Sequence, residues 1–192
     1  MNNILNSAPS EVLPGTTILY PTETVYGLGC RFDDPDALDA LYRMKGRASK
    51  IPVALIACSI AWVKEHFLLP SAAEALIQRY WPGPLAMLLE PKDTVLFRHV
   101  IHEGFVGIRV SGASISRDLA KVCVGAVVST SANLSGEPTP LDWRECPAAV
   151  TDAVTLIVDG GKLVEAPPST LIRFSGPGAD IEVLRQGSVT VV

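Results

Sequence analysis

The chain has 192 residues, 48% of them apolar, with 16 basic and 20 acidic side chains and a formal net charge of −4. This size and apolar content predict a single domain over residues 1–192, and the acidic balance excludes a protein that coats nucleic acid by charge alone. The four cysteines are scattered and no apolar run could span a bilayer. We therefore expect a reduced, cytoplasmic protein with no membrane partner.

Strands and helices alternate in the pattern of apolar residues along the chain. A strand at Thr16–Tyr20 precedes a glycine-containing stretch, residues 22–29, with the composition of a loop. A helix starts at Asp34-Pro35 and runs through Met44. The later expected elements are strands at Pro52–Cys58, Leu85–Leu89, Val106–Val110, Ala126–Thr130, Thr155–Val158, Ser169–Phe174 and Ile181–Arg185, and helices at Ser71–Tyr80 (N-cap Ser71) and Ile115–Val122. The irregular spacing predicts an α/β domain with a mixed sheet.

Two short polar motifs have the residue types that bind a triphosphate. Lys45-Gly-Arg47 closes the first helix, and its two cations can neutralise phosphate oxygens. The alternative is a purely structural role, in which these cations complement the dipole at the C-terminal end of the helix. Ser129–Gly136 follows an apolar strand, where Ser131 and Asn133 offer neutral donors and acceptors. An ordinary turn would have a similar composition, so this motif alone leaves both interpretations open.

A third motif, Pro21–Gly29, combines two threonines, a carboxylate, a tyrosine and two glycines. Its hydroxyls could bind a small polar substrate, or the segment could be a tight structural loop. The Trp81-Pro-Gly-Pro84 segment is interpreted as a helix terminator. The sequence has neither a G-x-x-x-x-G-K-[ST] phosphate loop nor a G-x-G-x-x-G fingerprint. Any nucleotide must therefore be held by side chains in an open cleft.

Together these motifs resemble the YrdC/TsaC family of threonylcarbamoyl-AMP synthases, and the resemblance covers nearly the whole chain. Its length is that of the family's short, single-domain form. The matching segments are PTETVYGLGC at 21–30, KGR at 45–47, WPGPL at 81–85, GIRV at 107–110, STSANLSG at 129–136, DGG at 159–161, ST at 169–170 and LRQG at 184–187.

The resemblance implies a fold and a reaction. The fold would be a twisted, open mixed β-sheet with flanking helices and a concave cleft. The reaction would convert ATP, L-threonine and bicarbonate (or CO2) to L-threonylcarbamoyl-adenylate and pyrophosphate, by nucleotidyl transfer. A downstream threonylcarbamoyl transferase complex would then modify tRNA to N6-threonylcarbamoyladenosine. Whether this chain binds tRNA directly, even weakly, is left open.

The resemblance also implies roles for individual residues. Mg²⁺ would accompany ATP, with no metal ligand from a protein side chain, and no covalent enzyme intermediate would form. The implied catalytic residues are Lys45, Arg47, Ser131 and Asn133, which would also bind ATP together with Arg185; the implied threonine-binding residues are Thr24, Tyr26, Arg109 and Ser169. Beside these motifs the chain departs from the family pattern at Ala48, Ala86, Ser111 and Leu141.

Three alternatives stand beside the synthase. The first is a non-catalytic RNA-binding module, which the acidic balance and the scarcity of Lys/Arg clusters disfavour. The second is a carbamoyl-transfer domain like that of the hydrogenase-maturation proteins, which occurs inside much longer chains. The third is a paralogue of the same fold that has lost the reaction, against which the intact Lys45, Arg47, Ser131 and Asn133 argue.

Overall fold

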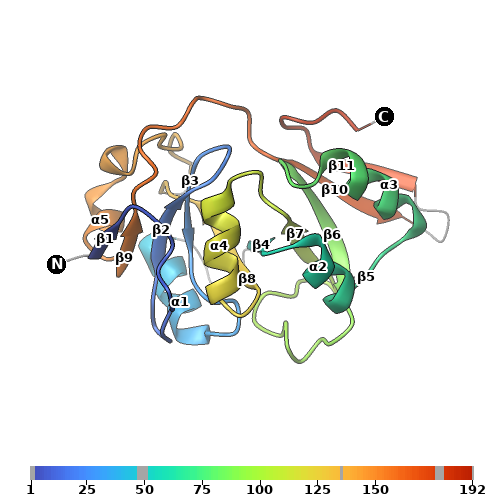
Figure 1. The fold of residues 1–192 in the computed structure, drawn as a ribbon, viewed down its shortest axis with the longest axis horizontal. Coiled ribbons are helices and arrows are strands. Elements are labelled where there is room, and N and C mark those ends of the chain that lie inside the picture. The colour runs from blue at the N-terminus through green and yellow to red at the C-terminus, as the bar shows by residue number, and fades with distance from the viewer. Residues whose placement is uncertain (1–2, 47–51, 135, 176–179, 192) are drawn as a thin grey trace.

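The computed structural model describes residues 3–46, 52–134, 136–175 and 180–191, which form one mixed sheet flanked by helices (Figure 1). The described strands are β1 (Asn3–Leu5), β2 (Ile18–Pro21), β3 (Tyr26–Gly29), β4 (Ala54–Ala57), β5 (Phe67–Leu68), β6 (Leu85–Pro91), β7 (Val106–Arg109), β8 (Ala126–Ser131), β9 (Leu156–Val158), β10 (Thr170–Ser175) and β11 (Asp180–Arg185). The helices are α1 (Pro35–Met44), α2 (Ile60–His66), α3 (Ser71–Tyr80), α4 (Ser114–Val122), the 3₁₀ helix η1 (Trp143–Glu145) and α5 (Ala148–Thr151).

The strand order is β1-β9-β2-β3-β8-β4-β7-β6-β10-β11, with β5 paired to β6 outside this path. Parallel pairs such as β4–β7 and β6–β10 occur beside antiparallel pairs such as β4–β8 and β6–β7. The predicted mixed α/β sheet is therefore confirmed.

Alternate residues along the central strands divide the core between the two faces of the sheet. Leu55 of β4 joins a large apolar cluster that includes α1 and α2, whereas its neighbour Ile56 joins a smaller cluster with Leu119 of α4. Helix α4 packs against β8, β4 and β2. The candidate site is a cavity on this same face of the sheet, next to α4.

Two expectations about local structure were wrong. Half of the stretch predicted as a loop, residues 22–29, is strand β3, which pairs with β2 and β8. Its Gly29 lies so close to β8 that an added Cβ would collide with the carbonyl oxygen of Val128, so glycine here allows close approach and not a turn. Ser71 is the first residue of α3; the N-cap is Pro70, with no side-chain cap. Elements β1, α2, β5, η1 and α5 were not predicted.

Helix α1, which ends immediately before Lys45, is fixed at its start by Asp34, as predicted. Asp34 Oδ1 accepts the Ala37 N–H at 3.0 Å, and Oδ2 accepts the Gly15 N–H at 2.6 Å. We expect Asp34→Ala to lower the free energy of unfolding by about 1–2 kcal/mol, because both donors lose their acceptor. Urea unfolding measures this. The exposed Asp39→Ala on the same helix is the control, with a change expected within about 0.5 kcal/mol; equal midpoints for the two variants would contradict the capping role.

Candidate active site

A cavity of about 290 Å³ opens on the α4 face of the sheet. Strands β3, β4, β6, β7, β8, β10 and β11 contribute to its walls, together with the β2–β3 turn and residues 168–169. Five of the residues predicted from the sequence line this one cavity: Thr24, Arg109, Ser131, Ser169 and Arg185. They come from five separate segments, so only the fold brings them together.

The floor of the cavity exists because small residues face it from neighbouring strands. Ala54 of β4 is the lateral partner of Ser129 on β8 and of Gly107 on β7, and Gly107 is in turn the partner of Leu88 on β6. All four residues line the cavity. A Cβ at Gly107 would lie 3.7 Å from the Ala54 Cβ, an ordinary contact. Glycine at this position therefore leaves space that a larger side chain would fill.

The β2–β3 turn presents Thr24 to the cavity in a fixed position. The Thr22 hydroxyl oxygen accepts the backbone N–H groups of Thr24 and Val25, each at 3.1 Å. The hydroxyls of Thr22 and Thr24 lie 3.0 Å apart. The neighbouring α4 is tied to the same turn, because the Ser116 hydroxyl donates to the Pro21 carbonyl at 2.8 Å. These bonds hold the Thr24 side chain at the cavity wall before any ligand is present.

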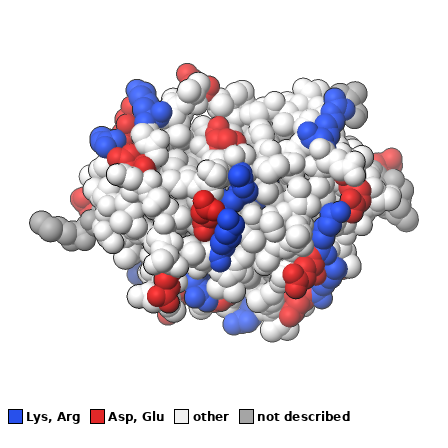
Figure 2. All heavy atoms as spheres, in the orientation of Figure 1, with Lys and Arg blue, Asp and Glu red and all other residues white. Residues whose placement is uncertain are grey.

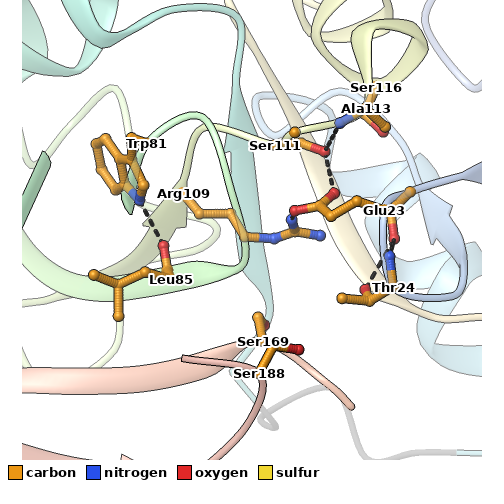
Figure 3. Close-up of polar contacts among 12 residues, drawn as sticks. Glu23, Thr24, Trp81, Leu85, Arg109, Ser111, Ala113, Ser116, Ser169 and Ser188 are labelled. Carbon is orange, nitrogen blue, oxygen red and sulfur yellow. Dashed lines mark hydrogen bonds and ion pairs between the residues drawn. The ribbon is translucent and has the colours of Figure 1, made fainter. Parts of the chain in front are cut away.

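A partly buried ion pair between Arg109 and Glu23 borders the cavity. Figure 3 shows the Arg109 side chain extending from the end of β7 towards Glu23, and Nη1 donates to Glu23 Oε1. The other carboxylate oxygen accepts the Ser111 hydroxyl, whose oxygen in turn accepts the Ala113 N–H at 3.2 Å. The Arg109 side chain is 7% exposed. Sequence reasoning did not assign Glu23 or Ser111 to the site. The signals were a carboxylate in the Pro21–Gly29 motif and the departure from the family pattern at Ser111.

Lys45 meets the Ser131–Asn133 segment at the end of β8. Its Nζ donates to the Ser131 carbonyl, to the Asn133 carbonyl at 2.9 Å and to Asn133 Oδ1 at 3.4 Å. Asn133 Oδ1 also accepts the Ser131 hydroxyl at 2.5 Å. Lys45 is buried and contacts Ser131, which lines the cavity, whereas Lys45 and Asn133 are not among the described lining residues. The structure thus joins three of the four predicted catalytic residues; Arg47 lies outside the described residues.

The C-terminal segment holds the wall formed by Pro168 and Ser169. Arg185 donates from Nε to the Ser169 carbonyl and from Nη2 to the Ser169 hydroxyl, each at 3.1 Å. The β10–β11 register shifts between Leu171 and Ile172, and Arg185 lines the cavity as the partner of Leu171. A one-residue shift reverses which face a side chain takes. Although Arg185 is exposed by its accessible surface, desolvation by the surrounding protein and, secondarily, the charge of Arg109 lower the pKa of Arg185.

Gly187 lies directly against this wall. A Cβ there would collide with the Pro168 carbonyl oxygen and come within 2.6 Å of the Ser169 carbonyl carbon. We therefore expect Gly187→Ala to displace the Pro168–Ser169 wall, to lower the free energy of unfolding by about 1–3 kcal/mol and to weaken substrate binding. Thermal unfolding and substrate titration measure both effects. Gly15→Ala is the control: its φ of +81° strains an alanine, but its Cβ meets nothing within 4 Å, so it should lower stability without weakening substrate binding. Unchanged substrate binding by Gly187→Ala would contradict the prediction.

Tyr26 is placed differently from the other predicted threonine ligands. It is a fully buried residue of β3, its hydroxyl donates to the Gly161 carbonyl at 2.8 Å, and the same oxygen accepts the Gly160 N–H at 3.0 Å. Burial raises the pKa of the Tyr26 hydroxyl. The contacts that the structure gives Tyr26 therefore connect β3 to the Asp159-Gly-Gly161 turn, which precedes the chain crossing from β9 to β10 in Figure 1.

The fold and the cavity define a class of protein: an α/β domain whose mixed sheet carries, on one face, a preformed pocket lined by hydroxyl groups and two arginines, suited to an anionic small molecule. The chain belongs to the Sua5/YciO/YrdC family, because the family model described as "Telomere recombination" matches residues 12–187. No helix among the described residues has the length and apolar content needed to cross a membrane.

Three similar proteins give the family its context. The threonylcarbamoyl-AMP synthase of Pyrococcus abyssi is 34% identical over 174 residues, which cover 88% of this chain and 50% of that protein. The crystal structure of P. abyssi Sua5 complexed with L-threonine matches at a TM-score of 0.78 and 28% identity, over 90% of this chain and 51% of that one. This chain thus spans about half of each. Escherichia coli YciO matches at a TM-score of 0.80 over 97% and 96% of the two chains, and at 23% identity it shows the fold alone.

Proposed function

We propose that this protein is an L-threonylcarbamoyladenylate synthase, a nucleotidyltransferase that joins L-threonine, bicarbonate or CO2, and the AMP part of ATP, and releases pyrophosphate. The observation that carries the proposal is the convergence of Thr24, Arg109 and Ser169 with Ser131 and Arg185 on one cavity. The name of the P. abyssi relative and the threonine bound to P. abyssi Sua5 support it. The product would serve tRNA modification in the cytoplasm, through a separate transferase complex.

Threonine binding is assigned to the Arg109 end of the cavity. A guanidinium is the best side-chain partner for an α-carboxylate, because it offers charge-assisted hydrogen bonds. Among the described residues, Arg109 donates to a protein partner only through Nη1, so its remaining N–H groups are available to a ligand. The hydroxyls of Thr24 and Ser169 lie on the same cavity and supply the neutral hydrogen-bonding groups that an amino acid needs.

The phosphates of ATP are assigned to the end of β8. In this proposal the threonine amine and bicarbonate form a carbamate with release of water, or the amine adds to CO2 with loss of a proton. An oxygen of the carbamate then attacks the α-phosphorus of ATP, and pyrophosphate leaves. Lys45 and Arg47 offset the charge that spreads over the phosphate oxygens, while Ser131 and Asn133 hold the triphosphate in line. The apolar residues Val53, Leu88 and Leu171 line the same cavity, and their exclusion of water protects a carbamate that water would decompose.

Mg²⁺ is expected to reach the site on the phosphates of ATP. The described residues contain no group of three His, Cys, Asp or Glu side chains that could hold a metal ion by themselves. The hydroxyls of Ser129 and Ser131 at the cavity suit an ion that keeps its waters and is bound chiefly by phosphate oxygens. Bound there, the ion would supply charge neutralisation at the phosphates.

The deciding experiment measures pyrophosphate release from ATP with threonine and bicarbonate omitted in turn, and searches the same samples for an AMP adduct of the expected mass. Release and adduct that require both co-substrates would establish the synthase. Release without threonine would indicate another acceptor. No turnover would favour a paralogue without the reaction, or the RNA-binding alternative, for which affinity should fall steeply with salt.

Basic and acidic side chains intermix on the face in Figure 2, which does not favour RNA binding there.

A further inference from the structure

Glu23 is a partly buried carboxylate at the end of the cavity where the amino acid is proposed to bind. We propose that Glu23 sets the net charge of this end at +1, so that the cavity accepts one substrate carboxylate and rejects amino acids that carry two. The inference rests on the proposed function and adds to it a determinant of substrate class: a monocarboxylic amino acid. Glu23 acts through Arg109 and is a positioning and charge-setting residue.

The charge of this end follows from three side chains. Among the described residues that line the cavity, the charged ones are Arg109 and Arg185. Glu23 pairs directly with the Arg109 guanidinium. Two positive charges and one negative charge leave +1 on the protein side chains at this end. Threonine and aspartate share the α-carboxylate and the α-ammonium, so they differ in charge only by the side-chain carboxylate of aspartate. Once the α-carboxylate has paired with a guanidinium, that side-chain carboxylate has no cation left at this end, and burying an unpaired charge is strongly unfavourable. The carbamate carboxylate formed in the proposed reaction is directed instead to the end of β8, where Lys45 lies.

Glu23 is held where its charge must act on the cavity. Its side chain is 18% exposed, and Ser111 donates to the carboxylate oxygen that Arg109 does not use. The Ser111 hydroxyl oxygen is itself anchored by the Ala113 N–H ahead of α4. Figure 3 shows this chain of contacts running from Arg109 through Glu23 to Ser111. Glu23 therefore cannot turn away when a ligand arrives, and poor access to water leaves its charge weakly screened.

The decisive substitution removes the charge of Glu23 and keeps its shape. In Glu23→Gln the amide oxygen can still accept from Arg109 and the amide N–H can donate to Ser111, but the cavity end becomes +2. With the full chain and no nucleotide, we would measure the dissociation constant of L-threonine and the inhibition constant of L-aspartate against labelled threonine. The ratio of the aspartate inhibition constant to the threonine dissociation constant is expected to fall about 30-fold or more. This is the size of one unit-charge interaction across several ångströms of protein.

Three further variants separate charge from structural damage. Glu23→Gln/Arg185→Gln returns the charge to +1, so discrimination against aspartate should return although the same buried group is altered. Lys121→Ala removes an exposed charge of α4 that lies outside the cavity and should leave the ratio within about threefold. Arg185→Gln alone lowers the charge to zero and should weaken threonine binding about tenfold. Because Arg185 is exposed, the Arg185→Gln protein can still be assayed if Glu23→Gln does not fold.

The outcomes separate this inference from the proposed function. A wild-type protein that binds threonine and makes the adenylate, with an unchanged ratio in Glu23→Gln or no restoration in the double variant, would overturn the role of Glu23 alone. Threonine affinity in Arg185→Gln equal to that of the wild type would overturn the charge balance. A wild-type protein that neither binds threonine nor releases pyrophosphate would overturn both.

Discussion

Replacing Lys45 with alanine is expected to lower the rate of adenylate formation about 100-fold or more, the effect of removing one key electrostatic donor. The change removes a buried cation from beneath Ser131. It also leaves the carbonyls of Ser131 and Asn133 without the donor that the structure gives them. Both losses act on the segment that is proposed to orient the triphosphate, so the effect should appear in kcat more than in the affinity for threonine. Initial rates of pyrophosphate release measure it.

Lys121→Ala is the matched control for this experiment. Lys121 is an exposed residue of α4 that pairs with Asp118 at 2.7 Å, and its loss should leave the rate unchanged. A Lys45→Ala protein that is folded and retains more than about a tenth of the wild-type rate would contradict the assignment of Lys45 to the phosphates. The same prediction holds for Arg47→Ala, which the sequence supports and the described residues do not address.

Replacing Arg109 with methionine is expected to weaken L-threonine binding about 30-fold or more. Truncating one partner of a buried, hydrogen-bonded charge pair costs about 2–5 kcal/mol, and here the lost guanidinium is the proposed partner of the substrate carboxylate. The substitution also leaves Glu23 buried without its cation, so the free energy of unfolding should fall. Equilibrium binding of labelled threonine and urea unfolding measure the two effects separately.

The double variant Arg109→Met/Glu23→Leu shows whether the two effects have different origins. Removing both charges leaves no unpaired carboxylate, so the double variant should recover much of the stability lost in Arg109→Met. Threonine binding should not recover, because the cation is still missing. A double variant that regained threonine affinity would show that Arg109 supports the site only indirectly.

Much of the fold was predictable because its signals are local. The Asp34-Pro35 start of α1 and the apolar strands β4, β6, β7 and β8 are visible in short windows of sequence, and all occur where expected within a few residues. The strand β3 was missed because its glycines have the local signature of a loop. Its identity depends on a close approach to Val128, about a hundred residues away along the chain, and no local pattern contains that information.

The candidate site was predictable in part, for the same reason. The Lys45 and Ser131 motifs have residue types that bind phosphate, but a helix-dipole role and an ordinary turn were open alternatives for them. The role of Arg109 rested on the family resemblance. Tyr26 belonged to the same motif as Thr24, yet its hydroxyl meets the Gly160–Gly161 backbone. Thr24 lies in the β2–β3 turn and Tyr26 is the first residue of β3, so membership of one motif does not decide which side chains reach the cavity.

The sequence by itself determined the alternating α/β pattern, the polar motifs and the family resemblance, because each rests on residue types at short spacing. Only the tertiary structure decided that Thr24, Arg109, Ser169 and Arg185 share one cavity, and that Glu23 neutralises one of its two arginines. Glu23 and Arg109 are 86 positions apart. Their pairing depends on the order of the strands and on the position of α4, and it is this non-local packing that sets the charge of the site.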